Sequence, residues 1–392
     1  METDIGKIMN KQEQHTYFFP NEPLRLTQED LNAILVHCSK LNASDITLQT
    51  SQPVIAEIYG RILKVTRRPL ANNEVGEALN AMYGPNGTAQ LNSGIDIDTH
   101  YEVRPSRSER YRFRVNGTGC LVDGHSGIQI TIRTIPTDPP KLEELGLPQT
   151  IIDAIAPDQG VVYITGSTGS GKSTLLASII RHIAEDPNSH RKILTYESPI
   201  EFIYDNLVMP TAVVSQSEIP RNLPNFAAGI RNALRRKPHL ILVGEARDTE
   251  TISAAMEAAM TGHPVYTTLH SNGVSETVRR LVNTFPVEEK NGRTIDLFET
   301  MRLVVWQKLV PTIEGKRVAL REYLVFDEYI RDQLLSSPPE SVTNTVRKLL
   351  KTHGQTMEVD ARKHYDAGII AERTYQLIAA LDKGVDKDHG LA

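Results

Sequence analysis

A glycine-rich loop stands between an apolar strand pattern and an apolar helix pattern, and it restricts the possible folds more than any other feature. The strand pattern covers residues 161–165, and the helix pattern begins at Leu175. The loop between them consists of Gly166, Ser167, Thr168, Gly169, Ser170, Gly171, Lys172, Ser173 and Thr174. The order strand, G-x-x-x-x-G-K-S-T loop, helix is typical of proteins built around a mostly parallel sheet.

The residue types of this loop suit a triphosphate. Glycines let successive backbone N–H groups turn inward around a phosphate, because a Cβ at those positions would block the approach. Lys172 is expected to reach the β- and γ-phosphates and Ser173 to ligate Mg²⁺, while the following helix adds the partial positive charge of its N-terminus. The sequence therefore predicts a site for ATP and Mg²⁺.

Composition excludes several other classes of protein. The chain has 392 residues, enough for two or three domains, and its 43 Lys and Arg residues against 48 Asp and Glu create no global basic field for nucleic acid. Two cysteines exclude a disulfide framework and suit a reducing cytosol. No apolar run approaches ~18 residues, so we expect a cytoplasmic protein that reaches a membrane only through partners.

The first half of the chain predicts a small α+β domain with an antiparallel sheet. Residues 1–26 are polar and aperiodic, which indicates an N-terminal arm, and the domain is expected over residues 27–135. Helices are expected from Thr27 onward and over Asn73–Tyr83. The expected strands are 45–48, 54–65 with a turn near Tyr59, 95–103, 111–116 and 128–135.

One strand of this domain carries arginines at alternate positions. Arg110, Arg112 and Arg114 alternate with Tyr111 and Phe113, so the arginines should leave one face of the strand. Three like charges side by side repel, which favours contact with an anion over a solvated face. The aromatic residues occupy the opposite face, which weakens a base-stacking platform for nucleic acid. A phosphate bound by another domain or subunit fits the pattern better.

Beyond a proline-containing linker at residues 136–148, the pattern changes to alternating strands and helices over residues 149–338, as a parallel sheet requires. We expect an amphipathic helix at residues 294–308, an extended polar loop around residues 215–224, and a C-terminal helical tail at residues 339–392. The expected strands are 161–165, 192–197, 239–245 and 265–270, and the expected helices are 173–185, 225–236, 249–261 and 274–284.

Polar side chains end three of these strands. Glu197 ends the second strand and Glu245 the third, and an acid at such a place holds the Mg²⁺ water shell or orients the attacking water. His270 ends the fourth strand, and the sequence leaves open whether its role is structural or catalytic. Because open parallel sheets bind ligands at the C-terminal ends of their strands, we expect these side chains beside the phosphate loop.

The ordered set of motifs resembles the secretion and type IV pilus ATPases related to PilT. Residues 166–174 resemble the Walker A motif of that family, 194–202 its aspartate box, 244–248 its Walker B motif and 261–270 its histidine box. Residues 112–116 are similar to the arginine strand of its PAS-like N-terminal domain.

One box departs from the family pattern, because Glu197-Ser198-Pro199 stands where the family usually has Glu-Asp-Pro. The departure removes an acidic role for position 198 and leaves Glu197 as the residue that activates water. Together with the polar arm and the polar loop, the serine form suggests the DotB/TraJ branch of type IVB secretion and conjugation ATPases.

The resemblance implies a homohexameric ring with ATP bound between a PAS-like N-terminal domain and a RecA-like domain. It implies Mg²⁺-dependent hydrolysis that drives a secretion or conjugation machine at the inner membrane, without direct nucleic-acid binding. The implied catalytic residues are Lys172, Glu197, Glu245 (acting on Mg²⁺ through water), His270, Arg112 and Arg114. Three alternatives stay open, namely a PilT-type pilus retraction ATPase, a RecA-like nucleic-acid translocase and a nucleotide-binding scaffold that barely hydrolyses.

Overall fold

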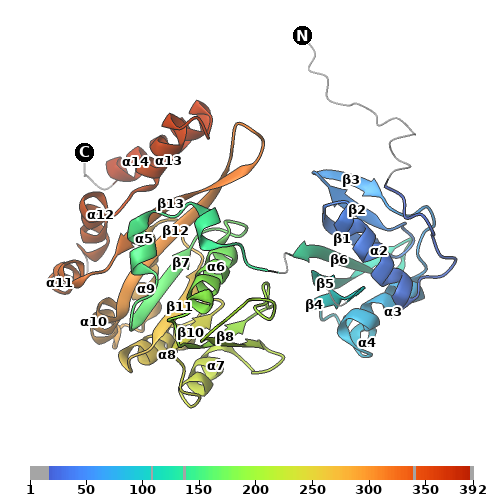
Figure 1. Cartoon of the computed structure of the whole chain (residues 1–392), viewed down its shortest axis with the longest axis horizontal. Coiled ribbons are helices and arrows are strands. Elements are labelled where there is room, and N and C mark those ends of the chain that lie inside the picture. The colour runs from blue at the N-terminus through green and yellow to red at the C-terminus, as the bar shows by residue number, and fades with distance from the viewer. Residues whose placement is uncertain (1–16, 107–108, 136–137, 339–340, 389–392) are drawn as a thin grey trace, which may run out of the picture. The chain divides into compact units, whose positions relative to one another are not determined.

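The computed structural model describes residues 17–106, 109–135, 138–338 and 341–388, with side chains up to Leu381. Most of the expected N-terminal arm, and the last residues of the expected tail, lie outside these ranges. The chain divides into two compact units, Met1–Thr137 and Asp138–Ala392 (Figure 1). Within the described ranges, no helix is both long and apolar enough to cross a membrane.

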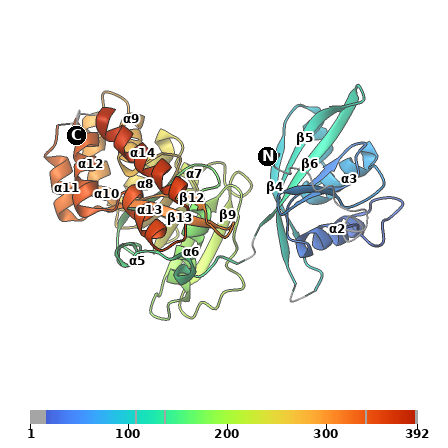
Figure 2. The ribbon, with the colours of Figure 1, turned by 90° about the horizontal axis from the view of Figure 1, so that it is seen from above.

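The first unit is a six-stranded antiparallel sheet with helices on one face. Its strand order is β3-β2-β1-β6-β5-β4. Figure 2 shows α2 and α3 on the same side of this sheet. The strands are β1 (Ala43–Gln49), β2 (Ile55–Ile58), β3 (Arg61–Lys64), β4 (Ile97–Val103), β5 (Tyr111–Val122) and β6 (His125–Ile135), and the helices are α2 (Gln28–Lys40), α3 (Asn72–Tyr83) and α4 (Gly87–Asn92).

Local signals explain these elements. Thr27 caps α2 as expected, because its hydroxyl accepts a hydrogen bond from the backbone N–H of Asp30 at 3.2 Å. Alternation along β5 buries Phe113 and Val115 against the helices. The arginines of β5 therefore lie on the other face of the sheet, as predicted from their spacing.

The second unit contains a seven-stranded sheet in the order β13-β12-β7-β11-β10-β8-β9. All neighbouring pairs are parallel except β12 with β13, which form an antiparallel ribbon. A mostly parallel sheet was predicted here. The strands are β7 (Gly160–Thr165), β8 (Lys192–Glu197), β9 (Val213–Glu218), β10 (Leu240–Val243), β11 (Pro264–Leu269), β12 (Met301–Pro311) and β13 (Arg317–Val325).

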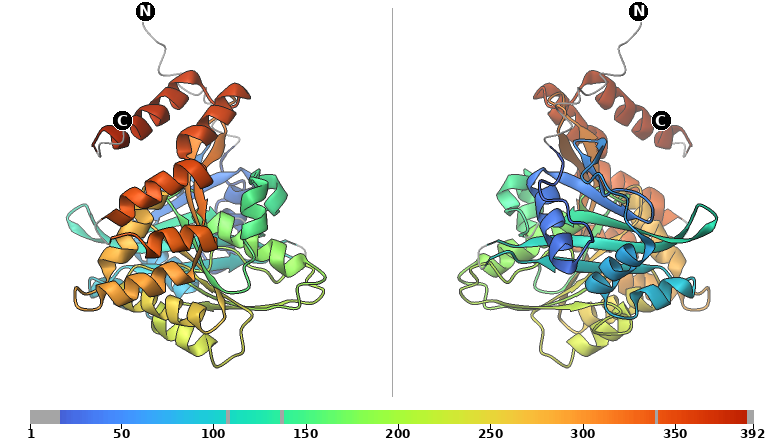
Figure 3. Two further views of the ribbon diagram at one scale, coloured as in Figure 1. Left: turned by 90° about the vertical axis from the view of Figure 1, so that its left-hand side faces the viewer. Right: turned by 90° about the vertical axis from the view of Figure 1, so that its right-hand side faces the viewer.

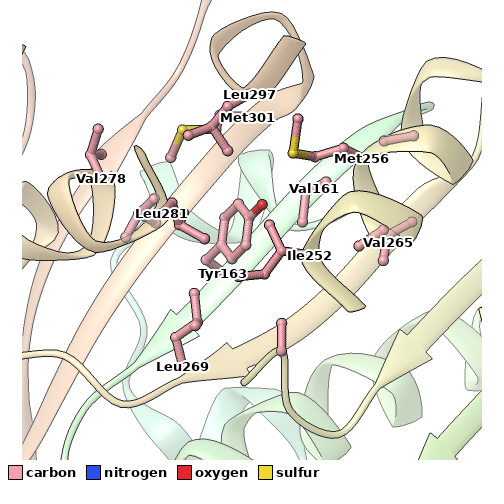
Figure 4. Packing of buried hydrophobic residues seen from close by; sticks show 14 of the residues in the cluster. Val161, Tyr163, Ile252, Met256, Val265, Leu269, Val278, Leu281, Leu297 and Met301 are labelled. Carbon is pink, nitrogen blue, oxygen red and sulfur yellow. The ribbon is translucent and has the colours of Figure 1, made fainter. Parts of the chain in front are cut away.

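Helices cover both faces of this sheet, so its central strands are buried on both sides. Val162 and Ile164 of β7 pack toward α5 (Gln149–Ala154) and α6 (Lys172–Glu185), in a core that also contains Leu142 of a short 3₁₀ turn, Leu142–Leu145. Val161 and Tyr163 point the other way, toward Ile252, Met256, Leu281 and Leu297 (Figure 4). The helices on that second side are α7 (Phe226–Ala233), α8 (Thr249–Met260), α9 (Val274–Thr284) and α10 (Lys290–Thr300).

The C-terminal part of the chain is helical, as expected. Its helices are α11 (Glu328–Leu335), α12 (Val342–His353), α13 (Met357–Asp366) and α14 (Glu372–Asp388). Whereas α11 and α12 extend the core beside α9 and α10, α13 and α14 pack on the β12–β13 ribbon through a small separate cluster that includes Leu320, Met357 and Ile378. Figures 1 and 3 show α13 and α14 side by side in red.

Two sequence predictions are wrong. The helix expected at residues 294–308 ends at Thr300, and residues 301–308 belong to β12. The run Met-Arg-Leu-Val-Val is apolar on both faces, and a short apolar run of this kind does not separate a buried strand from a helix by periodicity. The polar loop expected around residues 215–224 instead begins with β9, which pairs in parallel with β8 at the edge of the sheet. A half-buried polar edge strand carries little apolar signal.

Candidate functional site

The glycine-rich loop joins β7 to α6 in a conformation that only glycine adopts easily. Gly166, Gly169 and Gly171 have φ angles of +146°, +75° and +85°. A Cβ on Gly166 would lie 2.4 Å from the backbone oxygen of Gln307, so the loop packs directly on β12. Substitution at Gly166 is therefore excluded both by backbone conformation and by space.

Lys172 places its charge inside the curve of the loop. It is the first residue of α6, is only 9% exposed, and its Nζ donates to the carbonyl oxygens of Gly166 at 3.0 Å and Ser167 at 2.9 Å. Burial lowers the pKa of Lys172, while Glu245 and Glu201 act in the opposite direction.

Other groups of the loop also suit a bound phosphate. Within the described residues, Ser170 Oγ is buried with no hydrogen-bond partner. Ser173 is exposed in the first turn of α6, at the positive end of the helix. These features fit a nucleoside triphosphate with Mg²⁺, because the site combines a buried cation, the positive end of a helix and a loop whose glycines leave room for a phosphate.

Glu245 and His270 meet beside the loop. They follow the neighbouring strands β10 and β11, and Glu245 Oε1 lies 3.5 Å from His270 Nε2. The other carboxylate oxygen of Glu245 lies 2.7 Å from Nε of Arg247. Burial lowers the pKa of His270, and the positive charge of Lys172 lowers it further. The imidazole therefore favours its neutral form near neutral pH.

Glu197 ends β8, on the far side of β10 from β11. Its Oε1 accepts hydrogen bonds from Thr195 Oγ1 at 2.6 Å and from Gln216 Nε2 at 3.1 Å. The backbone N–H of Gly244 donates to the carbonyl of Tyr196 at 2.7 Å, which ties the end of β10 to that of β8. The second unit thus places four residues at the C-terminal ends of its parallel strands, namely Lys172, Glu197, Glu245 and His270.

Arg112 and Arg114 belong to the first unit, where their described ion pairs are with carboxylates of β4. Nη2 of Arg114 lies 2.6 Å from Asp98 Oδ2, and Nε of Arg112 lies 3.9 Å from Glu102 Oε2. Arg114 is 38% exposed, but the side chain of Arg112 is only 2% exposed. Arg112 is therefore buried within the first unit, whereas Arg114 is partly exposed.

Sequence reasoning missed three polar residues around the site. Gln216 lies on the unpredicted strand β9 and holds Glu197. Gln307 and Arg321 lie on the β12–β13 ribbon, where Gln307 Nε2 donates to the carbonyl of Ser170 at 2.7 Å. Alternation of polar and apolar residues within these strands was the only available signal, and it does not reveal which loop a side chain meets.

Comparison with known proteins assigns this architecture to a family. A family model described as type II/IV secretion system protein matches residues 25–354. The chain belongs to that family. Among curated relatives, the type IV pilus retraction ATPase PilT of Pseudomonas aeruginosa is 34% identical over 303 residues, covering 77% of this chain and 84% of PilT.

Solved structures of this family agree over nearly the whole chain. The X-ray structure of the ATPase DotB of Legionella pneumophila is 63% identical with a TM-score of 0.86, covering 92% of this chain and 98% of DotB. A crystal structure of the pilus retraction motor PilT with bound ADP is 30% identical with a TM-score of 0.78, covering 90% of this chain and 96% of PilT. The chain is therefore a PilT-like secretion ATPase family member with strong similarity to DotB.

Proposed function

We propose that this chain is a DotB-type motor ATPase that hydrolyses ATP to drive a type IV secretion or conjugation machine. The observation that carries the proposal is the buried Lys172 within the glycine loop, which feels the charge of Glu245, together with Glu197 at the end of the strand that pairs with β10. The 63% identity with DotB supports this machine over other members of the family. Hydrolysis of bound Mg–ATP supplies the free energy for mechanical work.

The residues divide the reaction between them. The glycine loop and Lys172 bind the phosphates, and Ser173 holds Mg²⁺ together with Glu245 acting through water. Glu197 orients and deprotonates the attacking water, and the hydrogen bonds from Thr195 and Gln216 hold its carboxylate at the end of β8.

Two further groups complete the proposed machinery. Neutral His270 beside Glu245 senses the γ-phosphate end of the site. Arg112 and Arg114 contribute positive charge to the transferring phosphate. We infer a PAS-like fold for the first unit and a RecA-like fold for the second.

The working assembly we propose is a cytoplasmic homohexamer that docks on inner-membrane secretion proteins. In this proposal the protein associates with the membrane only by binding those partners. It does not bind nucleic acid directly. A pull-down of the protein from native cells identifies the machine, and recovery of type IV secretion components is the expected outcome. Recovery of pilus assembly proteins would instead favour the PilT-type alternative, which the 34% identity with PilT keeps in view.

Lys172→Ala tests nucleotide binding. We expect it to abolish ATP hydrolysis and to weaken binding of a fluorescent ATP analogue at least about a hundredfold, because the buried triphosphate loses its compensating cation. Lys316→Ala removes a lysine that is 78% exposed on the β12–β13 turn and serves as the control. Full activity in Lys172→Ala would exclude the proposed function.

A further inference from the structure

Gln307 touches the phosphate loop at three places. Its side-chain Nε2 donates to the carbonyl of Ser170 at 2.7 Å, and a Cβ on Gly171 would lie 2.9 Å from the same nitrogen. Its backbone oxygen lies against Gly166 at the start of the loop. One residue of β12 therefore contacts both the start of the loop and the turn that leads into α6.

Arg321 stands directly behind Gln307. The two residues are opposite each other in the antiparallel register of β12 and β13, and Arg321 Nε donates to Gln307 Oε1 at 2.9 Å. Both side chains are buried, at 3% exposed for Gln307 and 4% for Arg321. A hydrogen bond to the oxygen of an amide polarises the whole amide group, so the N–H groups of that amide become stronger donors. Arg321 therefore reinforces the bond from Gln307 to the loop.

Helix α13 holds Arg321 in turn. The backbone N–H of Arg321 donates to Asp360 Oδ2 at 2.8 Å, and Gln355 Nε2, just before the helix, donates to the carbonyl of Arg321 at 3.1 Å. Lys363 Nζ donates to Gln355 Oε1. A continuous line of buried polar contacts thus runs from α13 through Arg321 and Gln307 to the loop.

This line has a physical consequence for the loop. A phosphate cradle needs its N–H groups turned inward, so its carbonyl groups turn outward and require other donors. Gln307 supplies the donor for the Ser170 carbonyl, and loss of a partner for a buried carbonyl favours a different loop conformation. Burial lowers the pKa of Arg321 to about 10, and the carboxylate of Asp360 opposes that shift.

We propose that Gln307 and Arg321 are positioning residues of the nucleotide site, and that Asp360 makes the shape of the phosphate loop depend on helix α13. The inference rests on the proposed function, since it concerns the affinity of the same loop for nucleotide. It assigns the C-terminal helices a direct influence on nucleotide binding. A partner that moves α13 would then change the affinity of the site for ATP.

Gln307→Met tests the first step, because it keeps the length of the side chain and removes both hydrogen bonds. We expect the Kd for fluorescent ADP to rise about tenfold, and KM for ATP to rise more than kcat falls. Lys308→Met is the matched control, since strand alternation places this neighbouring side chain on the opposite face. An unchanged Kd in a Gln307→Met protein that is folded by circular dichroism overturns the proposal.

Asp360 tests the second step without touching the loop. Asp360→Asn keeps an oxygen that accepts from the Arg321 N–H, whereas Asp360→Ala removes it. We expect the alanine variant to bind ADP at least about threefold more weakly than the asparagine variant, and to have no further effect when combined with Gln307→Met. Equal affinity of the two variants overturns the link to α13, and this pair decides alone if Gln307→Met does not fold.

Lys172→Ala, measured in parallel, separates this inference from the proposed function. Loss of ADP binding in Lys172→Ala with normal binding in Gln307→Met would reject the positioning role only. Normal binding in Lys172→Ala would reject the nucleotide site itself.

Discussion

The two acids at the C-terminal ends of β8 and β10, Glu197 and Glu245, differ in the groups that they contact. Thr195 and Gln216 donate neutral hydrogen bonds to Glu197, whereas Glu245 faces Arg247 and His270. In the proposed reaction Glu197 is the base and Glu245 acts on the metal, so replacement of the two acids should have different effects.

Glu197→Gln tests the role of the base. We expect near-normal affinity for ATP with turnover lowered by about 10²–10⁴-fold, because a water-orienting base matters mainly in the transition state. ATP binding and steady-state hydrolysis are measured on the same preparation. Glu250→Gln, an acid on α8 that is 60% exposed, is the control. Wild-type turnover in Glu197→Gln would place the base elsewhere.

Glu245→Gln tests the role at the metal. We expect the Mg²⁺ concentration for half-maximal hydrolysis to rise about tenfold, since groups that act through a metal's water shell typically contribute this much to affinity. Titration of Mg²⁺ at saturating ATP measures the effect. An unchanged Mg²⁺ requirement would show that Glu245 does not act on the metal.

At the scale of elements, Glu74 at the start of α3 joins three segments of the first unit. Its carboxylate accepts bonds from Arg68 at 2.8 Å, from the backbone N–H of Leu26 at 2.7 Å and from that of Ala71 at 2.8 Å. The hydrogen bonds from Arg68 are the main cause that lowers the pKa of Glu74 to about 2 from an ordinary value of 4.5. A carboxyl group whose pKa is lower in the folded than in the unfolded protein stabilises the fold at pH values above its unfolded pKa.

Glu74→Gln should therefore lower the free energy of unfolding by about 2–3 kcal/mol at pH 7. The wild-type advantage should shrink as the pH falls from 4.5 toward 2, because the carboxylate becomes protonated in the unfolded chain first. Urea unfolding followed by circular dichroism at pH 7 and pH 3 measures both values. Glu77→Gln, on the same helix and 52% exposed, should change stability by less than about 0.5 kcal/mol. A pH-independent difference would contradict this account.

At the scale of the whole molecule, the proposed motor needs both units, because the nucleotide loop lies in the second and the arginine strand in the first. Arg114 is the cleaner probe of this dependence. Its side chain is partly exposed, whereas replacement of the buried Arg112 also removes packing from the sheet. A loss of activity in Arg112→Ala therefore needs a separate measurement of stability.

Arg114→Ala should lower ATP turnover by up to about 10³-fold without changing the mass of the assembly in light scattering, because removal of the arginine takes charge from the transition state. Arg112→Ala should show the same loss together with lower stability. Arg133→Ala is the matched control, since Arg133 pairs in register with Arg114 on β6 and is 63% exposed. Normal turnover in Arg114→Ala with lost binding of single-stranded DNA would favour the translocase.

Much of the fold could be predicted because its signals are local. Three kinds of feature each depend on a few consecutive residues: the loop at Gly166–Thr174, the capping of α2 at Thr27, and the strands that end at Glu197 and just before His270. The face of β5 that carries Arg112 also follows from alternation alone. Backbone sterics and side-chain periodicity act over this short range, so composition and order were sufficient to place these features.

Long-range pairing decided the rest. Residues 301–308 became a strand because β7 offers them hydrogen bonds and two apolar faces, and β9 formed because β8 pairs with its polar residues. The contact of Gln307 with the phosphate loop joins residues 137 positions apart, and that of Arg321 with Asp360 joins residues 39 apart. Local sequence determines which residues can bind a phosphate. Only the tertiary structure determines which distant side chains hold the loop in shape, because those contacts arise when the sheet assembles.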